Sequence, residues 1–232
     1  MSVSLVIPAF NEQSIIEKNI YTAMQFMSKN FNEYEVVVVD DGSSDRTVDL
    51  LTKTGATVIA LGKNYGKGAA IKSAMLYCDG DYIFFTDADL PYPLDFILRG
   101  VESLQNADMV CGMRFGNYPF ARRVTSQAYN YIAGAVLNMQ LNDVQCGIKG
   151  FTKNTAHNVF SRCRLDGFAF DTEAFFIANQ LGYKISSIDV PISHRKNSKV
   201  NMINDSLQMV ADLIRIRRSY EKGEYNLQKI FN

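Results

Sequence analysis

The chain has 232 residues, of which 47% are hydrophobic, 12% aromatic and 21% charged. These proportions exclude a disordered, collagen-like or low-complexity chain, and they predict one large globular domain or one domain with an extension. Lys plus Arg and Asp plus Glu both total 24, so the formal net charge is zero. This balance gives no electrostatic reason to expect a nucleic-acid partner, because such proteins normally carry a basic excess.

Four cysteines are widely spaced and form no CxxC pair: Cys78, Cys111, Cys146 and Cys163. A disulfide framework or a zinc site is therefore not expected, and reduced thiols in a cytosolic protein fit best. No apolar run approaches the ~18 residues of a membrane span, and no signal peptide precedes the first apolar run. We expect a protein that is soluble, or at most peripheral to a membrane.

The first half of the chain alternates short apolar runs with helical patterns. Strands are expected at 2–8, 35–40, 57–61, 81–86 and 108–112, with helices between them at 15–29, 46–54, 66–77 and 93–105. Ser14 is expected to cap the first helix and Asp45 the second. Because the strands are apolar on both sides and alternate with helices, the pattern predicts an α/β fold with a mostly parallel, Rossmann-like sheet covered by helices on both faces.

After residue 115 the alternation of strands and helices is less regular. It predicts an irregular stretch containing QCGIKGF, a strand over 184–190, and helices over 121–138, 171–181 and 202–219. No Pro/Gly/Ser-rich linker and no internal repeat interrupts the chain. Residues 1–219 are therefore interpreted as a single domain, in which the second half completes a site built by the first, followed by a tail at 220–232.

Acidic or amide residues follow three of the predicted strands. The first strand is followed by Asn11 and Glu12, the second ends in Asp40-Asp41-Gly42-Ser43, and the fourth is followed by Asp87-Ala88-Asp89. Ligands of open parallel sheets bind beyond the carboxyl ends of the strands. A turn or a helix cap explains any one of these clusters, but three of them at equivalent strand ends indicate a ligand site.

The pair Asp87 and Asp89 is the sharpest of these features. Two carboxylates two residues apart after a hydrophobic strand can address one divalent ion and a neighbouring sugar hydroxyl, and Mg²⁺ or Mn²⁺ suits such oxygen ligands. Asp40 or Asp41 could accept hydrogen bonds from a base or a ribose. Residues 63–68 (KNYGKG) open a helix and could approach a nucleotide, although a glycine-rich turn explains their glycines equally well.

Several other chemistries are excluded. No GxGxxG follows the first strand and no GxxxxGK[ST] occurs, which argues against a dinucleotide dehydrogenase and a P-loop enzyme. With two histidines, the sequence shows no Ser/His/Asp or Cys/His arrangement that would indicate nucleophilic catalysis. His157 is expected on a helix surface or in the core, whereas His194 lies in a polar segment.

Several motifs along the chain resemble those of a known protein family. SLVIPAFNE, EVVVVDDGSSDRT, NYGKGAA and FFTDADLPYP resemble the nucleotide-binding half of family-2 glycosyltransferases, which have the GT-A fold. In the second half, GMRF, RRVTS, DVQCGIKGF, GFAFDTE and VPISHRKNSKVN resemble polyprenyl-phosphate hexose transferases. The dolichyl-phosphate glucosyltransferase type is the nearest match, with the mannosyltransferases as cousins. The resemblance covers roughly residues 2–219 and implies a nucleotide-sugar half at 1–115 and an acceptor half at 116–219.

The resemblance also implies roles by position. Residues that would hold the nucleotide sugar are Pro8, Ala9, Glu12, Asp40, Asp41, Lys67, Asp87 and Ala88, with Asp89 binding the metal. Residues of the second half would lie near the acceptor phosphate or the donor diphosphate (Arg114, Arg123, Ser126), on the sugar side (Gln145, Gly147, Lys149) or in a flap over the diphosphate (Arg195, Ser198, Lys199). The expected catalytic residues are Asp89, Arg114, Arg123 and Lys149.

One position departs from the mannosyltransferase pattern. Those relatives often carry a Gln two residues after the second aspartate, where it can help to hold the metal. Here that position is Pro91, which has no side-chain oxygen. The resemblance therefore implies Mg²⁺ or Mn²⁺ at Asp89 and gives no further protein ligand.

A phosphate acceptor agrees with the residue types that are present. A hydroxyl acceptor needs a positioned carboxylate or histidine as its base, whereas a lipid monophosphate, with a second pKa of ~6, is largely dianionic at pH 7 and needs none. The demand then falls on stabilising the departing nucleoside diphosphate by a metal and by cations. Arg114, Arg123, Arg195 and Lys199 supply such cations, although a solvated face is the plain alternative for each arginine.

We therefore expect an inverting displacement at the anomeric carbon that moves a hexose to a polyprenyl phosphate. UDP-glucose is the expected donor, with other UDP-hexoses or N-acetylhexosamines left open. One alternative is a transferase that acts on a soluble glycan or a protein hydroxyl, which a base such as Asp143 or Glu173 near the acceptor would favour. A sugar-1-phosphate nucleotidyltransferase lacks support because no long glycine-rich, basic loop follows the first strand. An inactive binding module is disfavoured by the intact Asp87 and Asp89.

A lipid acceptor raises the question of membrane contact. The predicted helix at 202–219 has an apolar stripe and three arginines near its end (Arg215, Arg217 and Arg218), and the helix at 121–138 offers Tyr129, Tyr131, Ile132 and Val136. Such helices can bind a membrane interface. Core packing or a dimer contact explains the stripes equally well, and a helix C-terminus favours basic residues in any case. The expectation is a cytoplasmic protein that is peripheral on the cytoplasmic face of the membrane, with a homodimer left open.

Overall fold

The computed structural model describes residues 1–116, 120–139, 143–191 and 202–227, with only the backbone described at 120–123 and 202–207. The strands are β1 (Ser2–Ala9), β2 (Glu33–Asp40), β3 (Thr57–Ala60), β4 (Tyr82–Phe85), β5 (Met109–Phe115), β6 (Lys149–Thr152) and β7 (Ile185–Pro191). The helices are α1 (Ile16–Asn30), α2 (Thr47–Leu51), α3 (Lys67–Tyr77), α4 (Asp95–Leu104), α5 (Phe120–Leu137), α6 (Lys153–Phe160), α7 (Phe170–Gln180) and α8 (Met202–Glu221).

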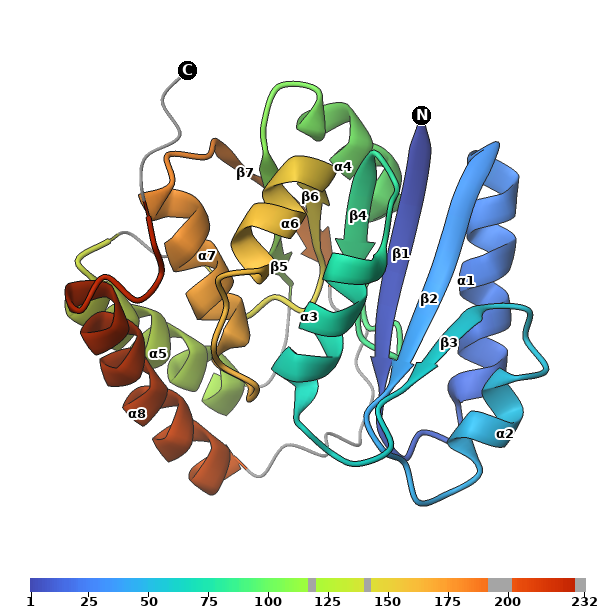
Figure 1. The fold of residues 1–232 in the computed structure, drawn as a ribbon, viewed down its shortest axis with the longest axis horizontal. Helices are drawn as coiled ribbons and strands as arrows, with labels where there is room; N and C mark the ends of the chain where they lie inside the picture. Colours follow the sequence, from blue (N-terminus) through green and yellow to red (C-terminus); the bar gives the residue numbers. More distant parts are fainter. Residues whose placement is uncertain (117–119, 140–142, 192–201, 228–232) are drawn as a thin grey trace.

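The strands form one seven-stranded sheet in the order β3-β2-β1-β4-β6-β5-β7 (Figure 1). The pairs β1–β2, β1–β4, β2–β3 and β5–β7 are parallel, whereas β6 is antiparallel to both β4 and β5. β4 and β5 therefore run in the same direction, and β6 starts at the edge where they end. The prediction of a mostly parallel α/β sheet is confirmed.

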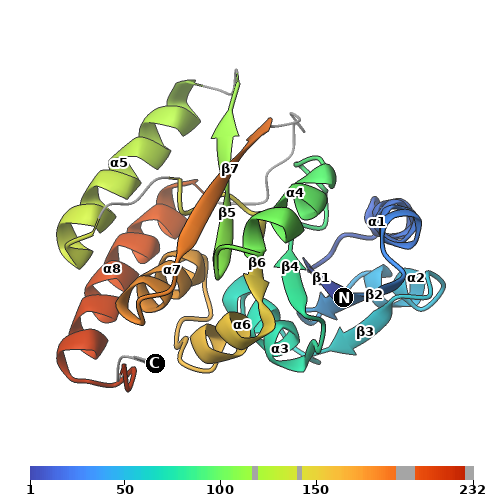
Figure 2. The same cartoon turned by 90° about the horizontal axis from the view of Figure 1, so that it is seen from above.

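Helices cover both faces of the sheet, because the side chains of each strand alternate between two cores (Figure 2). In β1, Val3 and Leu5 face the core that α1 and α4 complete, while Val6 faces the other core with α3. The second core is the larger one and includes residues of α3, α5, α6, α7 and α8. Burial of apolar surface on both sides explains why β1, β2 and β4, near the middle of the sheet, are largely apolar.

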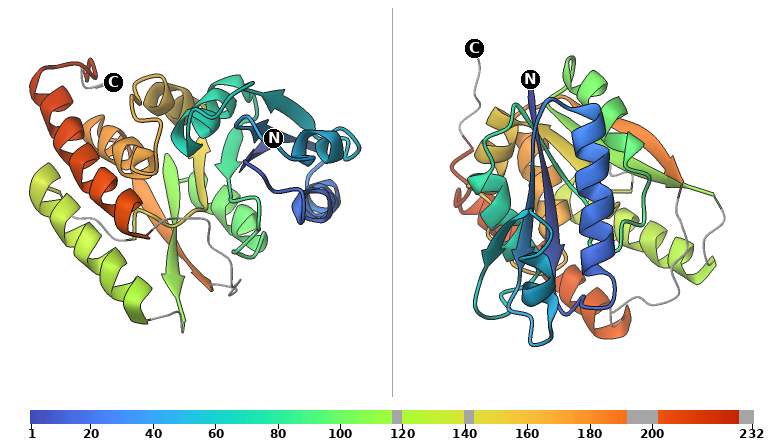
Figure 3. Two further views of the ribbon diagram at one scale, coloured as in Figure 1. Left: turned by 90° about the horizontal axis from the view of Figure 1, so that it is seen from below. Right: turned by 90° about the vertical axis from the view of Figure 1, so that its right-hand side faces the viewer.

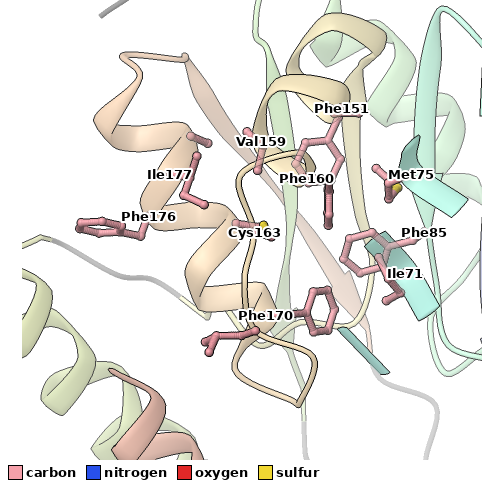
Figure 4. Packing of buried hydrophobic residues seen from close by; sticks show 14 of the residues in the cluster. Ile71, Met75, Phe85, Phe151, Val159, Phe160, Cys163, Phe170, Phe176 and Ile177 are labelled. Atoms are coloured by element: carbon pink, nitrogen blue, oxygen red, sulfur yellow. The ribbon is translucent and has the colours of Figure 1, made fainter. Parts of the chain in front are cut away.

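Aromatic rings fill the larger core beneath the ends of β4 and β6 (Figure 4). Phe85 of β4 lies 5.8 Å from Phe170 of α7 and 6.3 Å from Phe151 of β6, measured between ring centroids. Phe160 of α6 packs edge-on against Phe151 at 5.4 Å. These contacts fix the start of α7 against the end of β4, which is where the acidic cluster Asp87-Ala88-Asp89 begins.

Two elements were missed by the sequence pattern. The stretch that was expected to be irregular contains β6 and α6. β6 is only four residues long and begins with Lys149, a buried charge that breaks the apolar run by which a strand is recognised. Thr152 caps α6 by accepting a hydrogen bond from the backbone N–H of Thr155. A short strand between two longer neighbours is stabilised by its pairing in the sheet rather than by its own sequence.

The two expected helix caps also differ from the structure. Ile15, not Ser14, is the N-cap residue of α1, and no side chain caps that end; instead the carbonyl of Glu12 accepts hydrogen bonds from the N–H groups of Ile15 and Ile16. Arg46 is the N-cap residue of α2, which covers only 47–51 of the expected 46–54. Asp45 still accepts a hydrogen bond from the N–H of Thr47 at 2.9 Å, so it satisfies one donor of the first turn.

Helices α5 and α8 run side by side over the end of the sheet that carries β5 and β7 (Figures 2 and 3). Their apolar stripes contribute to the core, since Ala133 and Leu137 of α5 and Leu213 and Ile216 of α8 are buried. Tyr131, in contrast, is 81% exposed. Among the described residues, no helix is both long and apolar enough to cross a membrane.

Candidate active site

The functional candidates converge on one edge of the sheet. The carboxyl ends of β1, β2, β4 and β5 lie at that edge together with the first residue of β6. Pro8 and Ala9 are the last two residues of β1, Asp40 is the last of β2, and Asp87 follows β4 by two residues. In Figure 1 the arrowheads of β1 and β2 point down toward the loops that carry these groups. The topology therefore brings together residues that are far apart in the sequence.

The loops that follow β1 and β2 are joined by hydrogen bonds. The N–H of Asn11 donates to Ser43 Oγ, the N–H of Ser44 donates to Asn11 Oδ1, and the N–H of Glu12 donates to Thr47 Oγ1, each at 2.8 Å. Asn11 has a φ of 54°, a left-handed conformation that Asn tolerates better than most residues. These bonds hold the two loops as one wall of the site.

Asp40 and Asp41 have different environments. The carboxylate of Asp41 accepts hydrogen bonds from the N–H groups of Tyr65 and Gly66 at 2.7 and 2.9 Å, and so fixes the loop before α3. Asp40 is 2% exposed, and its Oδ2 accepts a hydrogen bond from the N–H of Ser43 at 3.0 Å. Within the described residues, Asp40 Oδ1 is buried and has no hydrogen-bond partner. A buried acceptor without a donor costs about 1–3 kcal/mol, so this oxygen is suited to a ligand that brings an N–H or O–H group.

Asp87 is held between a lysine and a glycine. Lys67 Nζ, from the first residue of α3, donates to Asp87 Oδ1 at 2.6 Å. A Cβ on Gly147 would lie 2.3 Å from Asp87 Oδ2, so only a glycine leaves room for the carboxylate. Burial lowers the pKa of Lys67, but the charges of Asp87 and Asp171 outweigh it and the net direction is upward. Lys67 is therefore a cation in this site.

The rest of the acidic turn is anchored to α1. Ala88 is buried, and its carbonyl accepts a hydrogen bond from Asn19 Nδ2 at 2.8 Å. Asp89 is half-buried. In the part of the chain that the structure describes, no group of three or more His, Cys, Asp or Glu side chains could by itself hold a metal ion.

A second charged group lies at the end of β5. The guanidinium of Arg114 makes a bidentate contact with both carboxylate oxygens of Asp143 and also donates to Ser126 Oγ of α5 at 3.1 Å. Burial lowers the pKa of Arg114, and the hydrogen bonds and charge of Asp143 raise it by more. The sequence-predicted residues Arg114 and Ser126 are thus in contact. Arg123 lies in the first turn of α5, where only the backbone is described.

Lys149 is fully buried at the start of β6. Its Nζ donates to Asp171 Oδ1 at 2.6 Å and to the carbonyl of Cys146 at 2.7 Å, and it lies 5.4 Å from the ring centroid of Phe85. Because it is 0% exposed, Lys149 cannot touch a sugar without rearrangement. Its predicted place on the sugar side is therefore not what the structure describes.

Other predicted residues lie nearby or outside the described ranges. Gln145 Nε2 contacts Met209 Sδ of α8 at 3.7 Å. His157 lies in α6, half-buried, with Nε2 3.0 Å from the carbonyl oxygen of Cys78. His194, Arg195, Ser198 and Lys199 fall outside the described residues.

Two site residues were missed by the sequence reasoning. Tyr92 is buried, and its Oη accepts a hydrogen bond from the N–H of Gly147 at 3.3 Å; burial raises its pKa, and Asp87 adds to the rise. Asp171 lies in the first turn of α7 beside Lys149. Both lie within motifs that carry the family resemblance, FFTDADLPYP and GFAFDTE, but no role was assigned to either residue.

Two carboxylates that would favour a hydroxyl acceptor are already engaged. Asp143 binds Arg114 through both oxygens. Glu173 Oε2 accepts hydrogen bonds from the N–H groups of Arg164 and Leu165, each at 2.9 Å, and its Oε1 accepts one from Tyr225 Oη at 2.7 Å. Burial raises the pKa of Glu173. Both groups have structural partners that a general base would have to give up.

The four cysteines are free and buried in the structure. Burial raises the pKa of the Cys78 and Cys111 thiols to about 12 and that of Cys146 to about 11, and it raises that of Cys163 as well. Because the thiolate is the reactive form, the native protein at pH 8 should resist iodoacetamide. Mass spectrometry should detect no alkylation in buffer and four alkylated cysteines in guanidinium. Rapid native labelling would contradict the burial described.

Solved structures share the fold of this chain. Glucosyl-3-phosphoglycerate synthase from Mycobacterium tuberculosis in complex with UDP superposes with a TM-score of 0.72 at 20% identity, covering 94% of this chain and 80% of that one. The same enzyme in complex with Mn²⁺, UDP and glucosyl-3-phosphoglycerate gives a TM-score of 0.71 at 19% identity over the same shares. At this identity the likeness shows the fold alone.

The family follows from the sequence match. Residues 4–159 match the family described as Glycosyl transferase family 2, so the chain belongs to that family and is a glycosyltransferase. Among curated relatives, a dolichyl-phosphate beta-glucosyltransferase of Dictyostelium discoideum is 28% identical over 97% of this chain and 77% of its own length. The human enzyme of the same name is 29% identical over 98% and 78%. The family expected from the motifs is confirmed.

Proposed function

We propose that this glycosyltransferase moves glucose from UDP-glucose to a polyprenyl phosphate, with inversion at the anomeric carbon. The observation that carries the proposal is its likeness, over nearly the whole chain, to relatives named dolichyl-phosphate beta-glucosyltransferase. The geometry adds support, because Arg114 and the Ser126 hydroxyl meet in the acceptor half, whereas both candidate bases already have partners: Asp143 is paired with Arg114 itself, and Glu173 is bound by Tyr225. That combination suits an anionic acceptor that needs no deprotonation.

The nucleotide would bind over the ends of β1 and β2. Asp40 Oδ1 is a buried acceptor without a partner in the described part of the chain, and the imide N–H of uracil is a donor of the matching kind. The loop from 63 to 66, fixed by Asp41, brings a half-exposed aromatic ring, Tyr65, to the same edge. A solved neighbour of the same fold is in complex with UDP, which supports a uridine nucleotide as part of the donor.

A divalent ion fits the residues present. Asp89 supplies a carboxylate oxygen at a strand end, and the diphosphate of a nucleotide sugar supplies further hard oxygen ligands, which is how Mg²⁺ is commonly held. Pro91 contributes no side-chain oxygen, in keeping with a site that the substrate completes. When bound, the ion would neutralise charge that develops on the leaving diphosphate. Mg²⁺ and Mn²⁺ both suit this donor set.

The reaction would be a direct displacement. An oxygen of the acceptor phosphate forms a bond to the anomeric carbon of glucose, while the bond from that carbon to the diphosphate oxygen breaks, and UDP leaves with the electron pair. Arg114 is suited to orient the attacking phosphate, because a guanidinium presents several donors in one plane. Ser126 Oγ, 3.1 Å from Arg114, offers a further hydroxyl to the same group. Arg123, Arg195 and Lys199 remain predictions for additional phosphate contacts.

A lipid acceptor would bring the enzyme to a membrane surface. The outward side of α5 carries Val124, Tyr131 and Ile132, which are 45%, 81% and 38% exposed. Exposed apolar side chains beside the Arg114–Ser126 group support peripheral contact through this helix. A cytoplasmic location, expected from the sequence, stays a prediction, and a homodimer stays open.

A direct assay tests the proposal. Purified protein with Mg²⁺ or Mn²⁺, a panel of UDP- and GDP-sugars and a polyprenyl phosphate should yield a lipid phosphate heavier by one hexose, detected by mass spectrometry. UDP-glucose should be the preferred donor, and the product should have the β configuration by NMR. Asp89→Ala should lower turnover at least ~100-fold because it removes charge stabilisation from the leaving group. Hydrolysis of the donor without any lipid product would instead indicate a soluble acceptor.

A further inference from the structure

A lysine is buried in the middle of the sheet behind the donor site. Lys149 lies in register between Phe85 of β4 and Cys111 of β5, and it is 0% exposed. Burying a charged group is costly unless it is paired and hydrogen-bonded. Asp171 and the carbonyl of Cys146 supply that pairing, at 2.6 and 2.7 Å. An apolar residue would suit this position in the sheet better, so the buried charge calls for a reason beyond packing.

Asp171 connects this buried lysine to a second, half-buried lysine, Lys67. Asp171 is 4% exposed and lies in the first turn of α7, directly after Phe170. The ring centroid of Phe170 is 5.9 Å from Lys67 Nζ, so the start of α7 lies beside Lys67. The backbone reinforces this contact, because the carbonyl of Asp166, in the loop before α7, accepts a hydrogen bond from the N–H of Gly68 at 2.7 Å. The start of α7 and the start of α3 are thus held together.

Positive and negative side chains alternate between the buried Lys149 and Asp87 at the donor site. Burial raises the pKa of Asp171, and the charges of Lys149 and Lys67 oppose that rise. Asp87 and Asp171 are the two largest Coulombic causes that raise the pKa of Lys67. Lys67 in turn donates to Asp87 at 2.6 Å. The order from the core to the donor site is Lys149, Asp171, Lys67, Asp87, with a carboxylate between the two cations.

We propose that Asp171 is a positioning residue for donor binding: backed by the buried Lys149, it fixes Lys67, and through Lys67 it holds Asp87 in place at the donor site. Without Asp171, the carboxylates that act on Lys67 are Asp87 and Asp89, both on the donor side, and Lys67 and Asp87 can move together. With it, Lys67 is placed from the core side, and Asp87 is confined between Lys67 and Gly147. The inference rests on the proposed function, since it assigns Asp87 to the binding of a nucleotide sugar.

The test separates positioning from simple structural support. Asp171→Asn keeps the size of the side chain but leaves Lys149 buried without its counter-charge, so its melting temperature should fall. The double variant Lys149→Met/Asp171→Asn removes both charges of the buried pair, and its melting temperature should return close to that of the wild type. Its Kd for UDP-glucose with Mn²⁺, measured by isothermal titration calorimetry, should nevertheless stay roughly tenfold above the wild-type value, because small misplacements of binding groups are costly.

The variant Lys67→Met tests whether Asp171 acts on Asp87 through Lys67. If Asp171 acts through Lys67, Lys67→Met should raise the Kd by a similar factor, and adding Asp171→Asn to it should raise the Kd no further. Glu173→Gln is the matched control, because it alters another buried carboxylate of α7 whose oxygens face Arg164, Leu165 and Tyr225. Its melting temperature should fall while its Kd for UDP-glucose stays unchanged.

Two results would overturn the inference. Recovery of both the melting temperature and the Kd in the Lys149→Met/Asp171→Asn double variant would reduce the pair to a structural role. Additive effects of Lys67→Met and Asp171→Asn on the Kd would show that Asp171 does not act through Lys67. A wild-type protein that binds no nucleotide sugar would overturn the proposed function itself, which the first titration shows before any variant is compared.

Discussion

Replacing Arg114 by methionine should lower turnover with UDP-glucose and a polyprenyl phosphate by on the order of 100- to 1,000-fold, the loss that follows removal of a preorganised donor from a transition state. Arg114 is held by both oxygens of Asp143 and reaches Ser126 Oγ, so its guanidinium is positioned before any acceptor arrives. Methionine keeps much of the aliphatic stem and removes only the cation. Steady-state kinetics with varied acceptor should show the loss.

The stability of the Arg114 variant needs a separate measurement. Asp143, with 17% of its side chain exposed, loses its partner in Arg114→Met, and breaking a largely buried pair can cost about 3–5 kcal/mol. Arg114→Met/Asp143→Asn removes that unpaired charge, so it should regain most of the stability without regaining turnover. Arg99→Met, in a half-exposed arginine of α4, is the control that should leave turnover unchanged. If the double variant turned over like the wild type, Arg114 would serve the fold alone.

Much of the fold could be predicted because each strand of the first half is apolar on both sides. The run EVVVVD, for example, can only be a strand buried between two helical layers, and β2 is such a strand. β6 could not be predicted in the same way. Its residues KGFT combine a charge with a glycine, and they form a strand because β4 and β5 offer hydrogen bonds on both sides. Tertiary pairing outweighs local propensity there.

The residues of the candidate site also fall into two groups, those that the sequence predicts and those that it does not. Residues that end strands of the first half could be found from the sequence, because Asp40, Asp87 and Asp89 follow recognisable apolar runs. Residues whose importance depends on a distant partner could not. Asp171 lies 22 positions after Lys149 in the sequence, and still farther from β4, the strand that precedes Asp87. Only the packing of α7 against β4 and β6 brings Asp171 to Lys149. Spacing along the chain carries no trace of such a contact.

The second large effect is expected at Gly147. An alanine there would place its Cβ 2.3 Å from Asp87 Oδ2 and 3.0 Å from Asp87 Cγ, both well inside contact distance. Its φ is not among the left-handed values, so the backbone itself tolerates alanine, and the strain falls on the Asp87 carboxylate. Asp87 must then move and disturb its 2.6 Å bond to Lys67. The Kd for UDP-glucose should rise roughly 10- to 100-fold, in line with the cost of misplacing a positioned group by about 1 Å.

Gly167→Ala is the matched control for this prediction. A Cβ on Gly167 would meet no atom nearer than 4.0 Å, and Gly167 lies in the loop before α7, outside the contact between Asp87 and Lys67. That variant should keep both its melting temperature and its Kd. Calorimetric titration of UDP-glucose into the two variants gives a direct comparison of one added methyl group at two glycines. An unchanged Kd for Gly147→Ala would mean that the position of the Asp87 carboxylate does not govern donor binding.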